Sequence, residues 1–316
     1  MSKKAILFDS SKCTACKGCQ VACKCWNLLP SPTGLNENKF SGTHQNPPDI
    51  NGDTRLIITF NETEPPAALS TKPIGWAFGR RSCQHCCDAP CVTVCPGGAL
   101  SKDEETGFVT VDDSKCVGCQ YCSSACPFDV PRYYNDGTFG KTIINKCSGC
   151  VDRIENGMEP ACVSTCQPNA LKFGDRGEMV KIANEKVEWL HEQGYTDACV
   201  AGDDPDYRTH VIHVLKYGKA AHGMIENPQV PATVAMTQIM KPVTGAISGL
   251  TVLGLGAMFA LGVGYSRRKL VYNPETQDTI DYDTGEVIKQ GDGQDETSVK
   301  DHIFENLPIG KGGKHE

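Results

Sequence analysis

Cysteine is the residue type that most constrains this chain. The 316 residues include 19 cysteines, and because that number is odd, a framework that pairs every cysteine within the chain is excluded. Cys25, Cys87 and Cys199 stand outside any group. The other sixteen form four groups: Cys13, Cys16, Cys19 and Cys23; Cys83, Cys86, Cys91 and Cys95; Cys116, Cys119, Cys122 and Cys126; and Cys147, Cys150, Cys162 and Cys166.

The groups also repeat one another. The segment 11–16, Ser-Lys-Cys-Thr-Ala-Cys, returns at 114–119 as Ser-Lys-Cys-Val-Gly-Cys. A second pair of similar segments is 91–95, Cys-Val-Thr-Val-Cys, and 162–166, Cys-Val-Ser-Thr-Cys. Internal repetition of this kind predicts a duplicated module.

The spacing within the groups is typical of iron–sulfur sites. Cys-x2-Cys-x2-Cys-x3-Cys is the ligand run of a cubane [4Fe–4S] site, in which three close cysteines wrap one cluster and the fourth ligates a neighbour. Zinc is the main alternative, because Cys147-x2-Cys150 and Cys162-x3-Cys166 would suit a zinc ribbon if they stood alone. A four-ligand zinc site does not use a third Cys-x2 step, however, and three thiols on one turn are too crowded for disulfides. We therefore predict iron–sulfur clusters at all four groups.

The net charge of -7 belongs to one end of the chain. Residues 271–316 carry 11 acidic and 4 basic side chains, so the remaining 270 residues are neutral overall. A neutral body argues against binding to a phosphate backbone, and no nucleic-acid partner is expected. Four clusters would add a charge of about -8. Lys12, Lys17, Lys115 and Lys146 lie near the cysteine groups, and we expect them to be solvated surface residues.

The periodicity of apolar residues and the positions of turn-forming residues predict a body that contains both helices and strands. The long segment between Lys24 and Ser82 reads as loops and short strands, and a helix through Met179 and Leu190 is expected to end at Gly194. We expect His210, His213 and His222 to face solvent rather than to bind haem. The expected strands are 4–8, 108–111 and 210–215, with a hairpin that joins 133–134 to 142–144.

One segment is long and apolar enough to predict a membrane span. Residues 243–264 contain no charged side chain, and a helix of this length matches the roughly 30 Å hydrocarbon core. Gly245 and Gly249 form a GxxxG pair, which favours close helix contact. Arg267, Arg268 and Lys269 follow the segment, so the positive-inside rule puts the tail in the cytoplasm and the cysteine-rich body outside.

Several motifs together resemble one known family. They are Cys-Thr-Ala-Cys-Lys-Gly-Cys-Gln-Val-Ala-Cys at 13–23, Cys-Ser-Gly-Cys-Val-Asp-Arg at 147–153, Glu-Pro-Ala-Cys at 159–162 and Thr-His-Val at 209–211. The chain resembles the four-cluster iron–sulfur (beta) subunit of membrane-bound formate dehydrogenases, within the wider group that serves molybdopterin oxidoreductases. The similarity covers roughly the first 265 residues.

The resemblance implies a particular exchange of ligands between the groups. Gln167-Pro168 in place of the usual proline after the last cysteine, and Cys25 close after Cys23, depart from the family pattern without removing a ligand. The implied ligands are Cys13, Cys16, Cys19 and Cys166 for cluster one; Cys147, Cys150, Cys162 and Cys23 for cluster two; Cys83, Cys86, Cys91 and Cys126 for cluster three; and Cys116, Cys119, Cys122 and Cys95 for cluster four.

The fold class implied is α+β, with two interleaved bacterial-ferredoxin-like units and loop insertions. The divisions are 1–176 for the double ferredoxin-like domain (inner unit about 80–130), 177–241 for a small α/β extension, 242–265 for the transmembrane helix and 266–316 for an acidic cytoplasmic tail.

The resemblance also implies a role and a location. The chain would be an electron-transfer subunit with no catalytic site of its own, between a molybdenum or tungsten alpha subunit that carries molybdopterin and a membrane cytochrome b gamma subunit. It would be a single-pass protein of the inner membrane, its cluster domain on the periplasmic face. The same subunit of a membrane hydrogenase or of another molybdopterin reductase is the nearer alternative, and a zinc-binding scaffold is the more distant one.

Overall fold

The computed structural model describes residues 3–31, 42–66, 74–135, 140, 142–205, 207–237, 250–258, 270–276 and 278–290. The chain divides into two compact units, Met1–Thr244 and Gly245–Glu316. All 19 cysteines lie in the first unit, which is therefore the unit that holds every candidate site.

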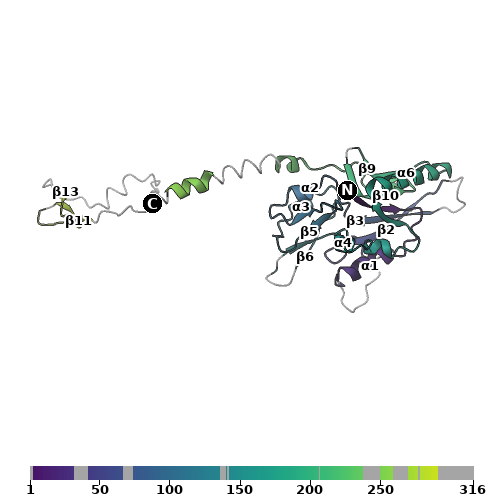
Figure 1. Ribbon diagram of the computed structural model, residues 1–316, viewed down its shortest axis with the longest axis horizontal. Coiled ribbons are helices and arrows are strands. Elements are labelled where there is room, and N and C mark those ends of the chain that lie inside the picture. The colour runs from purple at the N-terminus through teal and green to yellow at the C-terminus, as the bar shows by residue number, and fades with distance from the viewer. Residues whose placement is uncertain are drawn as a thin grey trace, which may run out of the picture. The chain divides into compact units, whose positions relative to one another are not determined.

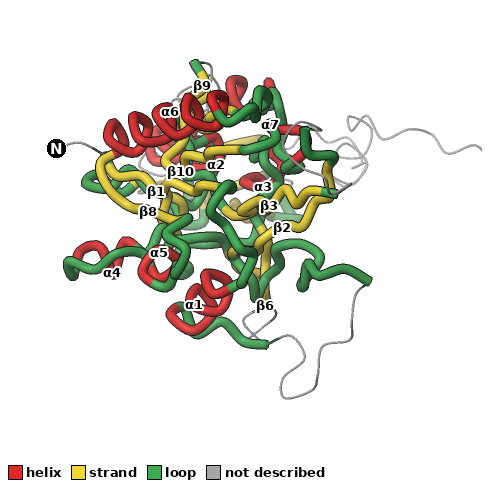
Figure 2. Tube along the Cα trace, turned by 90° about the vertical axis from the view of Figure 1, so that its right-hand side faces the viewer, coloured by secondary structure: helices red, strands yellow, loops and turns green. Residues whose placement is uncertain are grey.

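A four-stranded sheet forms one layer of the first unit, with strand order β8-β1-β10-β9 (Figures 1 and 2). β1 (Lys4–Asp9) pairs in parallel with β10 (Tyr207–Leu215) and antiparallel with β8 (Leu171–Asp175), and β9 (Cys199–Asp204) completes the far edge. Two of the expected strands, at 4–8 and 210–215, are confirmed. The segment 177–241 thus shares its sheet with strands from 1–176.

The alternation of apolar residues along β1 supplies the two faces of this sheet. Ala5 and Leu7 point to one side and pack against α6 (Arg176–Glu192), the helix that covers that face in Figure 2. Ile6 and Phe8 point to the opposite side and join a core that includes cysteines. Side chains of a strand point alternately to opposite faces, so one short strand joins the helix layer to the cysteine-rich layer.

The α6 helix agrees with the sequence prediction. Met179, Ala183 and Leu190 are its buried residues and lie on the side that faces the sheet. Gly194 has φ 91° just beyond the helix, a left-handed conformation that commonly ends helices and that glycine adopts without strain.

Three hairpins and several short helices complete the described part of the first unit. The hairpins are β2 (Leu56–Thr63) with β3 (Gly75–Ser82), β4 (Leu100–Lys102) with β5 (Val109–Val111), and β6 (Arg132–Asn135) with β7 (Thr142–Asn145). The helices are α1 (Gly18–Trp26), α2 (Pro90–Thr93), α3 (Tyr121–Ala125), α4 (Val151–Glu155), α5 (Ala161–Ser164) and α7 (Gly218–Ala221). The expected pairing of 133–134 with 142–144 is confirmed, although its turn at 136–139 is outside the described residues.

The three histidines expected to face solvent are buried, so that prediction was wrong. His210, His213 and His222 expose 2%, 1% and 3% of their surface. Each ring accepts or donates a hydrogen bond inside the fold: His210 Nδ1 with the Lys4 carbonyl at 2.7 Å, and His213 Nε2 with Gln84 Oε1 at 2.9 Å. His222 Nδ1 lies 2.9 Å from the Phe78 carbonyl. The alternation of polar and apolar residues along β10 could not reveal this burial. Both faces of the sheet are covered, so side chains that point to either face are buried.

The predicted single-pass membrane localisation is corrected by the structure. In the part of the chain that is described, no helix is both long enough and apolar enough to cross a membrane. Of the predicted span at 242–265, residues 250–258 are described and are helical. The other positions of that span lie outside the described residues.

The second unit contains a small antiparallel sheet where the sequence suggested only a solvated tail. Its strands are β11 (Leu270–Tyr272), β12 (Thr279–Asp281) and β13 (Val287–Lys289), in the order β11-β12-β13. Asp281 is buried, and its backbone and carboxylate organise the turn that follows β12.

Candidate metal centres

The same backbone turn follows the first cysteine of every group. Two residues after Cys13, Cys83, Cys116 and Cys147, the backbone φ is 53°, 48°, 70° and 70°. The amide that this turn presents can reach the preceding sulfur: Ala15 N–H donates to Cys13 Sγ and Gly149 N–H donates to Cys147 Sγ, both at 3.4 Å. Positive φ costs free energy at alanine and histidine, so this turn is imposed by the site rather than by local preference.

The sequence repeat therefore corresponds to a repeated conformation. Lys17 and Gln120 occupy matching positions and have φ 62° and 61°, immediately before α1 and α3. These helices turn the third and fourth cysteines of their groups toward the interior, where Cys19, Cys23 and Cys122 are buried.

One cavity is lined by all four cysteines expected to hold cluster one. Cys13, Cys16 and Cys19 come from the first loop and helix, whereas Cys166 comes from the loop before β8. The space between the lining atoms is about 330 Å³, and its remaining wall includes Phe8, Ile58 and Leu171. Sulfur ligands in an apolar, water-poor enclosure are what a cubane cluster requires.

A second cavity is lined by the four cysteines expected to hold cluster four. Cys95 reaches it from the loop after α2, and Cys116, Cys119 and Cys122 from the loop and helix of the third group. The space is about 350 Å³. The two cavities thus have the same composition and nearly the same size, although they are built from different parts of the chain.

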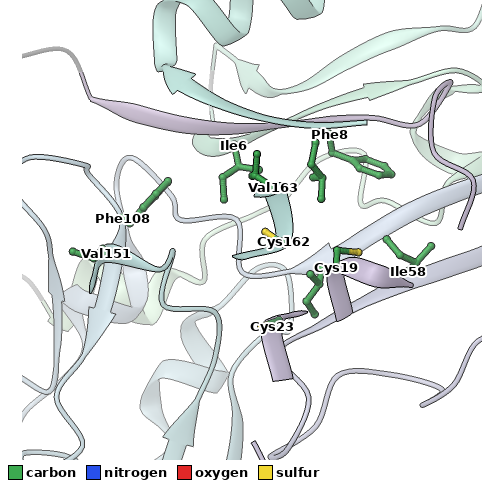
Figure 3. Packing of buried hydrophobic residues seen from close by; sticks show 11 residues of the cluster. Ile6, Phe8, Cys19, Cys23, Ile58, Phe108, Val151, Cys162 and Val163 are labelled. Atoms are coloured by element: carbon green, nitrogen blue, oxygen red, sulfur yellow. The ribbon is translucent and has the colours of Figure 1, made fainter. Parts of the chain in front are cut away.

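The cysteines expected to hold cluster two meet around α1, α4 and α5. Burial raises the pKa of Cys23, and Cys147, Cys162 and Cys150 raise it further because their charges repel a thiolate there. In Figure 3, Cys162 of α5 lies beside Cys19 and Cys23 of α1, below Ile6 and Phe8 of the sheet. The fourth cysteine of group one therefore lies near cysteines of group four.

The cysteines expected to hold cluster three are brought together in the same way. Burial raises the pKa of Cys86, as do Cys83, Cys91 and Cys126, while a hydrogen bond from Tyr207 lowers it. Burial likewise raises the pKa of Cys83, and Cys126 adds to this. Thiols held protonated by burial must release protons when they bind iron.

Contacts between these four sets follow a linear order. Cys19 of set one lies near Cys162 of set two. Burial is the main reason that the pKa of Cys19 rises to about 12, and the charge of Cys162 is the next. Cys83 of set three packs with Cys147 of set two in one apolar core. Burial, Cys83 and Cys126, with a smaller contribution from Cys122, raise the pKa of Cys91 to about 12, which links set three to set four.

Among the cysteines of the four sets, the two exposed residues lie at the two ends of this order. Cys16 of set one and Cys119 of set four are exposed, whereas the other cysteines of the four sets are buried or half-buried. Exposed apolar side chains flank one of these ends, where Val117 and Tyr121 are 67% and 60% exposed.

Two tyrosine hydroxyls contact cysteine sulfurs directly. Tyr207 Oη donates to Cys86 Sγ at 3.0 Å, and Tyr133 Oη lies 3.2 Å from Cys122 Sγ. Hydrogen bonds to ligand sulfurs help to set the potential of an iron–sulfur centre. Sequence reasoning missed both residues because no spacing rule relates them to the cysteines.

Two buried cations lie among the cysteines. Lys146 is 3% exposed, so the expectation that it is a solvated surface residue was wrong; its Nζ donates to the carbonyls of Val109 and Cys147. Arg80 on β3 is equally buried. Thiolates, which form when the cysteines bind iron, would stabilise cations that burial alone would disfavour.

Three cysteines contribute to none of the four sets. Cys25 is exposed at the end of α1, and Cys87 and Cys199 are half-buried. Among the residues that the structure describes, no three His, Cys, Asp or Glu side chains are grouped so as to hold one metal ion. Each cysteine of a [4Fe–4S] site binds a different iron rather than one shared ion, so the four-cysteine sets remain the candidate centres.

Comparisons with known proteins agree with this chemistry. A family model described as a 4Fe-4S dicluster domain matches residues 74–176. The formate dehydrogenase-O iron-sulfur subunit of Escherichia coli is 34% identical over 273 residues, which are 83% of this chain and 84% of that protein. The nitrate-inducible formate dehydrogenase iron-sulfur subunit of the same organism is 33% identical over 259 residues, 81% and 82% of the two chains. The thiosulfate reductase electron transfer subunit PhsB of Salmonella typhi is 37% identical over 196 residues, 61% and 88%.

Proposed function

This chain belongs to the family of formate dehydrogenase iron–sulfur subunits, and on that premise we propose how it carries electrons. It is an electron-transfer subunit that binds [4Fe-4S] clusters and works with a separate catalytic alpha subunit. We propose that it holds four clusters, in two interleaved ferredoxin-like units with loop insertions. The observation that carries this proposal is that two separate cavities are each lined by four cysteines drawn from two distant groups.

The proposed ligands are the four sets described above. Set one is Cys13, Cys16, Cys19 and Cys166; set two is Cys147, Cys150, Cys162 and Cys23; set three is Cys83, Cys86, Cys91 and Cys126; set four is Cys116, Cys119, Cys122 and Cys95. The contacts of Cys19 with Cys162, and of Cys83 with Cys147, support the order one, two, three, four.

Each part of the chain has a distinct task in this proposal. A [4Fe–4S] cluster, when bound, supplies reversible one-electron chemistry. The chain's cysteines hold the clusters, and apolar residues such as Phe8, Ile58 and Leu171 keep water from the site of set one. Backbone amides, including those of Ala15 and Gly149, donate hydrogen bonds to ligand sulfurs and stabilise negative charge on them.

The partners are proposed to dock at the two ends of the order. Cys16 and Cys119 are exposed there, so a donor or an acceptor can approach the terminal sets without opening the fold. We propose a molybdenum or tungsten subunit as the partner at one end and a cytochrome b as the partner at the other.

The number and the ligands of the clusters can be measured directly. Chain purified without oxygen should contain about 16 iron and 16 acid-labile sulfide atoms, with a brown colour that bleaches on reduction. Cys166→Ser should perturb one cluster only, and Cys25→Ser, an exposed thiol outside the sets, should leave the iron content unchanged. A colourless, zinc-containing protein, or a Cys166→Ser variant with wild-type spectra, would refute the assignment.

Relatives with other catalytic subunits define the nearest alternative. Similarity to a thiosulfate reductase electron transfer subunit favours a complex with a different molybdopterin enzyme as the second candidate. Mass spectrometry of the complex purified in mild detergent, together with a formate:quinone assay, separates the two. A co-purifying large subunit without formate activity would favour the alternative and leave the electron-transfer role in place.

A further inference from the structure

Arg80 combines complete burial with unsatisfied hydrogen-bond donors. It lies on β3 and exposes 3% of its surface. Its Nη1 donates to the Ser82 hydroxyl. Its Nε and Nη2 meet no partner of good hydrogen-bond geometry among the described residues, although the Cys162 sulfur interacts with the guanidinium. Buried polar groups without a partner are rare in folded proteins and call for a specific explanation.

The charge of this guanidinium also lacks an ordinary counter-ion. None of the ion pairs formed by the described residues includes Arg80. Arginine cannot lose its proton in a protein, and a buried charge without a partner is strongly unfavourable. The neighbouring imidazoles of His85 and His213 cannot compensate, because an imidazole is either neutral or positively charged. Burial lowers the pKa of both, and Lys146 and Arg80 at His85, and Arg80 at His213, lower it further.

The groups that can balance the charge are cysteine sulfurs of two different sets. Burial lowers the pKa of Arg80, but Cys162, Cys147 and Cys19 outweigh this effect and raise it. Cys162 and Cys147 belong to set two, whereas Cys19 belongs to set one. Arg80 therefore lies where the first two sets adjoin; two of these residues, Cys19 and Cys162, belong to one buried core, which Figure 3 shows.

We propose that Arg80 is a positioning residue that sets the reduction potentials of the centres held by sets one and two, through its charge and through hydrogen bonds from Nε and Nη2 to their sulfur atoms. Reduction adds negative charge, which a fixed cation and hydrogen-bond donors stabilise more in the reduced than in the oxidised state. Arg80 therefore raises the potentials of these two centres. The inference rests on the ligand sets proposed above.

The test is a redox titration of the fully loaded protein, followed by electron paramagnetic resonance. Arg80→Gln should lower the equilibrium constant for reduction of one or both centres at least tenfold, which is about 59 mV for a one-electron couple. Arg80→Lys, which keeps the charge, should recover most of the loss. Arg81→Gln is the matched control, because Arg81 follows on the same strand but pairs with Asp49.

Unchanged potentials in a fully loaded Arg80→Gln protein would overturn the inference. If that variant does not assemble, wild-type protein labelled with ¹⁵N-arginine provides a second test. The role is supported if a reduced centre in the wild type couples magnetically to arginine ¹⁵N and this coupling shrinks or disappears in Arg80→Lys. The absence of any such coupling in the wild type refutes it. Failure of the ligand assignment itself would appear separately, as a wild-type iron content short of four clusters.

Discussion

At the scale of single residues, the cysteines supply the ligands and their neighbours supply the electrostatics. Spacing identifies the first kind of residue, because three ligands on one turn leave a pattern in the chain. Tyr207, Arg80 and Lys146 belong to the second kind: Tyr207 and Arg80 reach the sets from β10 and β3, whereas Lys146 directly precedes Cys147. Sequence alone does not reveal the role of any of them, and only their contacts and burial do.

Tyr207 gives a prediction at this scale. Burial and the neighbouring Cys86 raise the pKa of its hydroxyl, which therefore stays a donor to Cys86 Sγ at neutral pH. If that bond is ~1 kcal/mol stronger in the reduced state, Tyr207→Phe lowers the potential of the set-three centre by ~40 mV. A spectroelectrochemical titration measures the shift. Tyr195→Phe, a ring packed in the α6 core, should change no potential, and an unaltered Tyr207→Phe titration would contradict the prediction.

At the scale of elements, the repeated turn determines how each group is built. The turn with positive φ occurs after the first cysteine of all four groups, although the residue there is Ala15, His85, Gly118 or Gly149. The position therefore tolerates a side chain in two groups, and what differs between groups is the packing around the turn.

Substitutions at Gly118 and Gly98 distinguish the cost of steric overlap from the cost of a left-handed backbone conformation. Both have positive φ, but a Cβ on Gly118 would lie 2.6 Å from the Thr142 carbonyl oxygen of β7, whereas a Cβ on Gly98 would meet nothing within 4 Å. Gly98→Ala should therefore cost only the left-handed conformation, roughly 1–2 kcal/mol. Gly118→Ala should add about 1–3 kcal/mol of overpacking and weaken cluster retention in set four. Thermal unfolding and iron content measure both effects, and equal losses in the two variants would argue against the contact with β7.

At the scale of the whole first unit, the sheet joins segments that are far apart in sequence. β1 pairs with β10 and with β8, which brings the loop of Cys13 next to the loop of Cys166. The same layering encloses His213 and His222 from both sides, and burial lowers their pKa values to about 3 and about 4.

These buried histidines predict acid sensitivity. An unfolded imidazole binds a proton near pH 6.5, while the folded ring stays neutral, so the unfolded state binds more protons as pH falls. The free energy of unfolding that each neutral buried histidine contributes is complete above about pH 6.5 and is lost progressively toward pH 4. The loss is about 1 kcal/mol per histidine between pH 7 and 5.5. Melting temperatures of His213→Gln should fall less steeply over this interval than those of the wild type. Slopes for His213→Gln that run parallel to those of the wild type would refute the account.

The sequence by itself determined the chemistry of this protein. The spacing of the cysteines indicated iron–sulfur sites, and the motifs indicated the family and its electron-transfer role, both of which the comparisons bear out. These conclusions depend on residues that are close in the chain, where spacing is a direct constraint on geometry. The helix of 179–190 and the strands of β1 and β10 were predictable for the same reason.

The tertiary structure alone decided what depends on distant contacts. It corrected the solvent-facing histidines, the solvated Lys146 and the single-pass localisation. It also brought Cys166 to the loop of Cys13, which spacing could not do because some 150 residues separate them. The burial of Arg80 between two sets is of this kind as well. Which side chains share an enclosure depends on how sheets and loops pack, and packing is a property of the whole fold rather than of any segment.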